Sequence, residues 1–94
     1  MMISKNLTIL NKLGLHARAA AKLVALSNNF KSEIILVKDN KSADARSIMK
    51  LLMLSASKGS VLEVKITGKD QEEAMGSIEK LFLNGLMRVY EFNH

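Results

Sequence analysis

The sequence predicts an α+β fold in which helices cover one face of a β-sheet. Some segments alternate between apolar and polar residues, which is typical of half-buried strands. Between them lie segments whose apolar residues recur every three or four positions, as in amphipathic helices. The resulting order of elements is βαββαβα. Because the helices follow the strands at short intervals, we expect an antiparallel or mixed sheet with all helices on one face, a two-layer α+β sandwich.

The first strand and the first helix are expected on either side of a short turn. The strand covers residues 5–11, with Leu7 and Ile9 on one side and mostly polar residues on the other. The helix covers residues 16–27, and its alanines are small enough to allow a close approach to a sheet.

The middle of the chain is expected to form two strands and a short helix. Residues 33–37 are rich in β-branched side chains and are apolar on both faces, which is typical of a central strand. Asp39 and Asn40 form a tight turn into a short strand at residues 41–43. Serine is a preferred N-cap residue, so a second helix is expected from Ser47 to about residue 54.

The last strand and the last helix close the predicted fold. Residues 61–67 alternate again, as in a strand with one solvated face. Asp70 and Glu73 match a capping box with aspartate in the cap position, so a third helix is expected to begin there. Gly85 suits the position after the C-cap. The buried stripe of this helix is expected to comprise Ala74, Ile78, Leu81 and Phe82.

Length and composition indicate one domain of a cytoplasmic protein. The 94 residues suffice for a single domain, with its core at about residues 5–86 and a tail at residues 87–94. Cysteine is absent and the two histidines are far apart, so we expect no disulfide, no metal and no cofactor. No apolar run is long enough for a signal peptide or a membrane span, so no membrane partner is expected.

The net charge of +5 raises a second hypothesis, a small basic nucleic-acid-binding domain. The lysines are scattered, however, and Tyr90 and Phe92 lie away from any basic cluster, so a platform for base stacking is poorly supported. Strong, salt-dependent binding to DNA or RNA in a gel-shift series would favour this hypothesis, and no binding at moderate salt would remove it.

The candidate site lies at the junction between the first strand and the first helix, residues 11–21. A helix N-terminus leaves backbone N–H groups without partners and carries the positive end of the helix dipole, which suits it to phosphate. His16 and Arg18 both lie there. Imidazole attacks phosphorus only when it is neutral, and the helix dipole and the guanidinium both disfavour its protonated form. The same two features stabilise a phosphate on the ring.

Two motifs resemble those of a known family. The stretch Asn-Lys-Leu-Gly-Leu-His-Ala-Arg-Ala at residues 11–19 resembles the active-site signature of the histidine-containing phosphocarrier proteins, HPr and its nitrogen-related sibling NPr. A second match is Ala-Arg-Ser-Ile-Met at residues 45–49, and the resemblance extends over about residues 5–86. It implies an open-faced β-sandwich, with a four-stranded antiparallel sheet and three helices on one face.

The resemblance also implies a function. His16 is expected to accept a phosphoryl group on Nδ1 from phosphorylated enzyme I, which takes it from phosphoenolpyruvate, and to pass it to enzyme IIA proteins. Arg18 matches the arginine that accompanies this histidine. The protein is thus expected to be a phosphoryl carrier rather than an enzyme, either in sugar uptake, as HPr, or in nitrogen-related regulation, as NPr. A regulatory paralogue that binds the partners without carrying phosphate would need neither His16 nor Arg18.

Most family members carry proline directly after the arginine, where this chain has Ala19. Proline presets φ at a helix start and lacks an N–H that would be unpaired there anyway. We therefore expect the alanine to loosen the start of the helix slightly and to leave one more N–H group free.

The second motif predicts a regulatory position and a docking surface. In Gram-positive relatives a serine at the position of Ser47 is phosphorylated by a kinase, which impairs partner binding, although helix capping alone also explains a serine here. A serine kinase or phosphorylase is therefore a conditional partner. Methionine suits a surface that serves several partners. The docking surface is expected to comprise Ile48, Met49 and Leu52, together with Ala17, Ala20 and Ala21.

Overall fold

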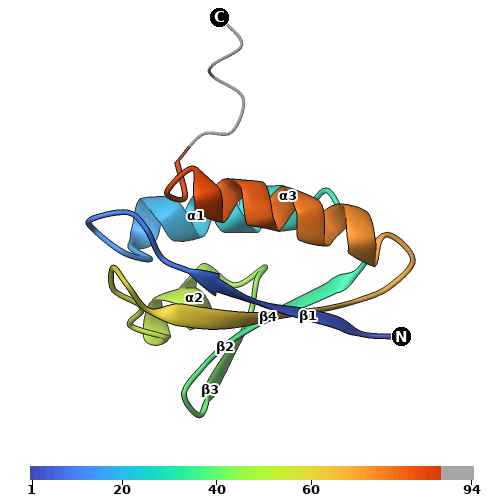
Figure 1. Cartoon of the computed structure of the whole chain (residues 1–94), viewed down its shortest axis with the longest axis horizontal. Helices are drawn as coiled ribbons and strands as arrows, with labels where there is room; N and C mark the ends of the chain where they lie inside the picture. Colours follow the sequence, from blue (N-terminus) through green and yellow to red (C-terminus); the bar gives the residue numbers. More distant parts are fainter. Residues whose placement is uncertain (88–94) are drawn as a thin grey trace, which may run out of the picture.

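The computed structural model describes residues 1–87 and has the predicted order of elements (Figure 1). These elements are β1 (Ile3–Thr8), α1 (Ala17–Ser27), β2 (Glu33–Lys38), β3 (Lys41–Asp44), α2 (Ile48–Met53), β4 (Val61–Thr67) and α3 (Gln71–Leu83). Most of the predicted tail, residues 88–94, lies outside the described residues. None of the described helices is both long enough and apolar enough to cross a membrane.

The four strands form one sheet in the order β1-β4-β2-β3, and every neighbouring pair is antiparallel. The two central strands are therefore β4 and β2, while β1 and β3 form the edges. In the register, Leu62 of β4 lies opposite Leu7 of β1, and Val64 of β4 lies opposite Leu36 of β2. The prediction of a four-stranded antiparallel sheet with three helices is confirmed.

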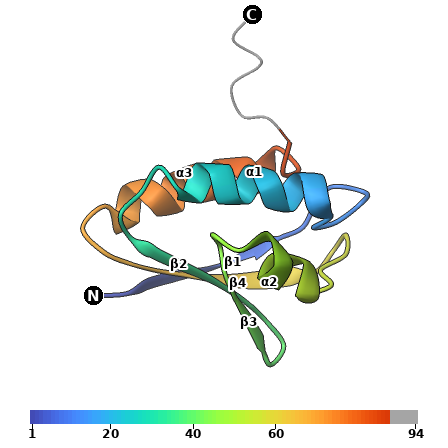
Figure 2. The same cartoon turned by 180° about the vertical axis from the view of Figure 1, so that it is seen from behind.

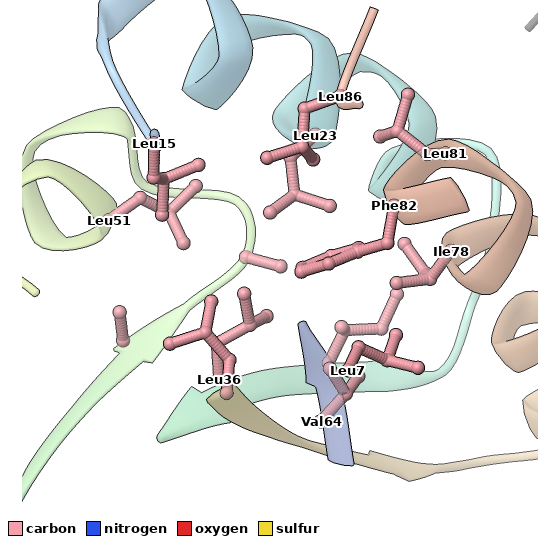
Figure 3. Packing of buried hydrophobic residues seen from close by; sticks show 14 of the residues in the cluster. Leu7, Leu15, Leu23, Leu36, Leu51, Val64, Ile78, Leu81, Phe82 and Leu86 are labelled. Carbon is pink, nitrogen blue, oxygen red and sulfur yellow. The ribbon is translucent and has the colours of Figure 1, made fainter. Parts of the chain in front are cut away.

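The two long helices, α1 and α3, lie side by side over one face of the sheet, whereas α2 lies beside β3 at one end (Figures 1 and 2). Side chains from the sheet and from all three helices meet in one core (Figure 3). Leu36 and Val64 come from the sheet, and Leu23, Leu51 and Phe82 come from the three helices in turn. Each fully buried side chain of this size contributes roughly 1.5–3 kcal/mol, so this core holds the helices to the sheet.

The apolar patterns predict the helices more accurately than the first strand. The whole predicted stripe of α3 is buried: Ala74, Ile78, Leu81 and Phe82. Gly85 has the positive φ expected after the C-cap, at 69°. The first strand, however, is Ile3–Thr8 rather than residues 5–11. The regular pairing with β4 ends where Thr8 lies opposite Val61, and beyond it Ile9 is hydrogen-bonded to Gly59 and Ser60, which precede β4.

The capping box predicted for α3 is wrong. Asp70 is the N-cap residue, but its side chain makes no hydrogen bond within the helix. Its carboxylate instead accepts from the backbone N–H of Lys31, at 2.9 Å, and from both the backbone N–H and the hydroxyl of Ser32. Asp70 therefore ties the start of α3 to the segment that leads into β2.

These hydrogen bonds lower the pKa of Asp70 below its ordinary value, with the Ser32 hydroxyl as the largest cause and the Lys31 amide next. A lowered pKa in the folded state means that the carboxylate stabilises the fold above the pKa of the unfolded chain, about 3.9. This stabilisation is lost as the pH falls through the lower pKa of the folded state.

We predict that Asp70→Asn unfolds at a lower urea concentration than the unmodified protein at pH 6, because the charged acceptor is lost. The difference should shrink as the pH is lowered towards 2, since the native carboxylate is then protonated as well. Urea unfolding at a series of pH values measures this. Glu73→Gln is the matched control, because it removes a charge from the same helical turn and leaves the contacts to Lys31 and Ser32 intact. An Asp70→Asn difference that does not change with pH would contradict the prediction.

Candidate functional site

The segment before α1 is held by backbone hydrogen bonds to the segment after α2. Ile9 donates to the carbonyl of Ser60 at 2.9 Å and accepts from Gly59 at 2.8 Å, and Leu15 donates to the carbonyl of Ala56 at 2.8 Å. The Leu15 side chain points toward Leu51 of α2 in the core (Figure 3). These contacts fix the backbone on both sides of the predicted site turn.

Gly14 permits the close approach of these two segments. Its φ is +69°, and an added Cβ would lie 2.5 Å from the Ala56 carbonyl oxygen and 2.9 Å from Ser57 Cα, both backbone atoms. The Asn11 side-chain amide donates to the Gly14 carbonyl at 2.6 Å and closes the turn from the other side. The glycine of the first motif is thus required by both its conformation and its packing.

His16 is the N-cap residue of α1. Its carbonyl accepts the first intrahelical hydrogen bond, from Ala20, at 2.8 Å. Its ring is only partly buried, and Nδ1 accepts from the backbone N–H of Ala19 at 3.1 Å. An acceptor at Nδ1 carries a lone pair, so the proton of the neutral ring is on Nε2. The N–H that we expected to be free at Ala19 is therefore paired with the histidine.

The surroundings of His16 are electropositive. The first turn of α1 contains no acidic residue, and the N–H groups of Ala17 and Arg18 have no intrahelical acceptor because they belong to that turn. Arg18 is exposed, and its guanidinium makes no hydrogen bond or ion pair with the residues described, 1–87. The ring of His16 thus lies at the positive end of a helix whose first turn holds two amides without an intrahelical acceptor and one arginine, a combination that suits a phosphoryl group.

Ser47 caps α2, as predicted, since its hydroxyl accepts from the backbone N–H of Lys50 at 3.2 Å. Before it, Arg46 reaches back to the end of α1. One terminal nitrogen of its guanidinium lies 3.1 Å from the Ser27 carbonyl, 2.6 Å from that of Phe30 and 3.0 Å from that of Ser32. A positive charge near the last carbonyls of a helix is favourable, so Arg46 links the C-terminus of α1 to the N-terminus of α2.

The exposed residues of α2 are mostly apolar, and Lys50 is the one charged residue among them. Met49 is 70% exposed and Ile48 is 39% exposed, whereas Leu52 is half-buried against the core. Met53, at 64% exposure, belongs to the same helix and was left out of the predicted docking surface. Large apolar side chains gathered on one short helix are typical of a surface that binds another protein.

On the α1 side the predicted docking surface needs a correction. Ala17 and Ala21 are exposed, but Ala20 is fully buried in the core and is unable to contact a partner. Leu13, which the sequence analysis did not single out, is 73% exposed three positions before His16. Its place inside the first motif was the signal available in the sequence.

The start of α1 and the whole of α2 lie at the same end of the molecule, a placement on which the two views agree (Figures 1 and 2). Direct packing between α1 and α2 agrees with this. The fold therefore brings together the two sequence motifs, which are about thirty residues apart in the chain.

Comparison with known proteins identifies the same family that the two sequence motifs resemble. Residues 3–84 match the family model described as the PTS HPr component phosphorylation site. The phosphocarrier protein HPr of Cupriavidus necator is 43% identical over 83 residues, which is 88% of this chain and 93% of that protein. The phosphocarrier protein NPr of Escherichia coli K12 is 42% identical over 86 residues, 90% of this chain and 96% of that one.

Solved structures agree with the sequence matches. HPr-C-His from Thermoanaerobacter tengcongensis has a TM-score of 0.85 at 38% identity, and the match covers 89% of this chain and 94% of that one. HPr from Bacillus anthracis has a TM-score of 0.79 at 36% identity, covering 83% of this chain and 93% of that one. The chain therefore belongs to the HPr family of phosphocarrier proteins of the phosphotransferase system.

We predict that Gly14→Ala destabilises the protein by more than about 1 kcal/mol, because the new Cβ meets backbone atoms and φ is positive. Urea unfolding measures the loss. Gly59→Ala is the matched control, since Gly59 also has a positive φ, +90°, but a Cβ there meets nothing within 4 Å. Gly59→Ala introduces the backbone strain without the steric clash. Equal losses of unfolding free energy in the two variants would therefore contradict the close approach at Gly14.

Proposed function

We propose that this protein carries a phosphoryl group on Nδ1 of His16, accepting it from phosphorylated enzyme I and passing it to an enzyme IIA protein. The observation that carries the proposal is the position of the ring at the N-cap of α1, with Nδ1 directed at a first-turn amide. Arg18 supplies the positive charge nearest in sequence.

The chemistry that we propose needs positioning more than covalent assistance. The lone pair of Nδ1 forms the new N–P bond, while the bond from phosphorus to the donor atom of enzyme I breaks and its electron pair returns to that atom. The proton on Nε2 remains in place. Charge on the phosphoryl oxygens is offset by the first-turn amides of α1 and by the Arg18 guanidinium, and in-line positioning supplies much of the remaining rate.

The exposed apolar residues around this site support docking of partner proteins. We propose that Ile48 and Met49 on α2, together with Ala17 and Ala21 on α1, form a small transient interface around His16, with lysines at its rim. A ring that is only partly buried at the start of a helix is accessible to more than one partner, as a carrier requires.

Two branches of the phosphotransferase system remain open to this carrier, sugar uptake and nitrogen-related regulation. The identities of 43% to an HPr and 42% to an NPr favour neither. The enzyme IIA protein that accepts the phosphoryl group fastest will decide between them.

We predict that incubation with phosphoenolpyruvate and enzyme I adds one phosphoryl group to the protein and none to His16→Ala. Intact-mass measurement reads this directly. His94→Ala is the matched control, because it removes the other histidine of the chain, and it should be phosphorylated like the unmodified protein. Phosphorylation that persists in His16→Ala, or that disappears in His94→Ala, would contradict the assignment.

We further propose that Ser47 is a regulatory position. A phosphate on this residue would be favoured by the N-terminus of α2 and would leave the helix intact, while it adds negative charge beside the apolar residues Ile48 and Met49. The added charge would disfavour docking of a phosphorylated, negatively charged donor.

We predict that Ser47→Asp keeps the fold, because aspartate caps a helix as well as serine does, and slows phosphoryl acceptance from enzyme I roughly tenfold, as expected for ~1.4 kcal/mol lost at an interface. Stopped-reaction mass measurement gives the rate, and urea unfolding checks the fold. Ser47→Asn is the matched control, since asparagine caps a helix about as well as aspartate does and adds no charge. Equal rates in the two variants would remove the regulatory role.

A further inference from the structure

The hydrogen bond between Ala19 and His16 has a consequence for the reacting atom itself. Ala19 occupies the third position of α1, and its N–H donates to Nδ1 of the histidine at 3.1 Å. In most capped helices a serine, threonine or aspartate oxygen fills this acceptor role. Here the acceptor is the ring nitrogen that we have proposed as the site of phosphorylation.

We propose that the Ala19 amide is a positioning group for phosphoryl transfer, one that selects the reactive tautomer of His16 and then donates to the phosphoryl group. The inference rests on the proposed function of His16. In the free protein the N–H of Ala19 occupies the lone pair of Nδ1, so it excludes a proton from that nitrogen and holds the proton on Nε2. This is the tautomer whose Nδ1 lone pair is able to attack phosphorus once the hydrogen bond from Ala19 breaks.

The same amide is available to the product. When the Nδ1 lone pair forms the N–P bond, the Ala19 N–H loses its acceptor, and the nearest new acceptors are the oxygens on the phosphorus. The bond to the phosphoryl donor breaks and its electron pair leaves with the donor, while the Nε2 proton of His16 stays on the ring. No proton is therefore transferred when the Ala19 amide changes acceptor.

Helix capping alone predicts something different. Capping requires only that Nδ1 accepts from a first-turn amide. It makes no prediction about how the proton is distributed between the two ring nitrogens when that amide is removed. Tautomer selection instead requires that loss of the Ala19 N–H changes the distribution of the proton between Nδ1 and Nε2 of His16. The position of that proton therefore separates a positioning role from a structural one.

The first experiment compares Ala19→Pro, which removes the N–H, with Ala19→Gly, which keeps the N–H and removes only the methyl group. The ¹⁵N shifts of the ring nitrogens, measured where His16 is neutral, report the ratio of tautomers. We expect the ratio of the Nε2–H tautomer to the Nδ1–H tautomer to fall about fivefold in Ala19→Pro, which is the effect of one ordinary hydrogen bond. In Ala19→Gly the same ratio should change less than twofold. An unchanged ratio in a folded Ala19→Pro protein would overturn the proposal.

A second measurement needs no variant and covers the case in which Ala19→Pro does not fold. In the uniformly ¹⁵N-labelled protein, a scalar coupling between the Ala19 amide nitrogen and Nδ1 of His16 is expected across the hydrogen bond, and its absence would overturn tautomer selection. After phosphorylation with phosphoramidate, a small-molecule donor, the Ala19 amide should still exchange slowly with solvent. A tenfold or larger increase in its exchange rate would show that it does not donate to the phosphoryl group.

These tests are separable from the test of the proposed function. The tautomer ratio and the coupling are measured without any phosphoryl group, and phosphoramidate replaces enzyme I as the donor. Failure of enzyme I to phosphorylate His16 would contradict the relay, whereas the ring-nitrogen data on His16 decide the role of Ala19.

Discussion

The backbone hydrogen bonds between the segment before α1 and the segment after α2 are the contacts on which the rest of the site depends. They join Ile9 to Gly59 and Ser60, and Leu15 to Ala56. The chain turns at Gly14 between these hydrogen bonds. The backbone of His16 is therefore already fixed at the start of α1. A ring held in this way loses little conformational freedom when a partner docks, which is a large part of what positioning contributes to phosphoryl transfer.

In the proposed carrier, the histidine would serve the fold and the chemistry through the same atom, Nδ1. Substitution of an ordinary N-cap costs a helix about 1 kcal/mol, so the start of α1 depends in part on a nitrogen that is also the proposed nucleophile. In most capped helices the capping side chain takes no part in a reaction, so capping and nucleophilic attack are not combined in one residue. Here the stability of the helix start and the protonation pattern of the ring are linked through Ala19.

The sequence predicts those features that depend on neighbours in the chain. The order of elements, the stripe of α3 and the Ser47 cap follow from local spacing, and all are found in the structure. The burial of Ala20 is harder to predict from the sequence, because adjacent alanines are equally apolar. Only their direction relative to the sheet decides which one is buried. Asp70 was misjudged for another reason: its partners lie 38 and 39 positions away in sequence, and they outcompete the local amide that a capping box requires.

Arg46 has a mechanical consequence. One of its nitrogens contacts the carbonyl oxygen of Ser27, the last residue of α1, and two more in the segment that follows, while the next residue in the chain caps α2. The two helices are thereby coupled at the end opposite to His16, as well as through Leu15 and Leu51 in the core. In the proposed carrier, a protein that docks on α2 would therefore bind a helix that is tied to α1 through Arg46, so a displacement of α2 would be passed to the helix that His16 caps.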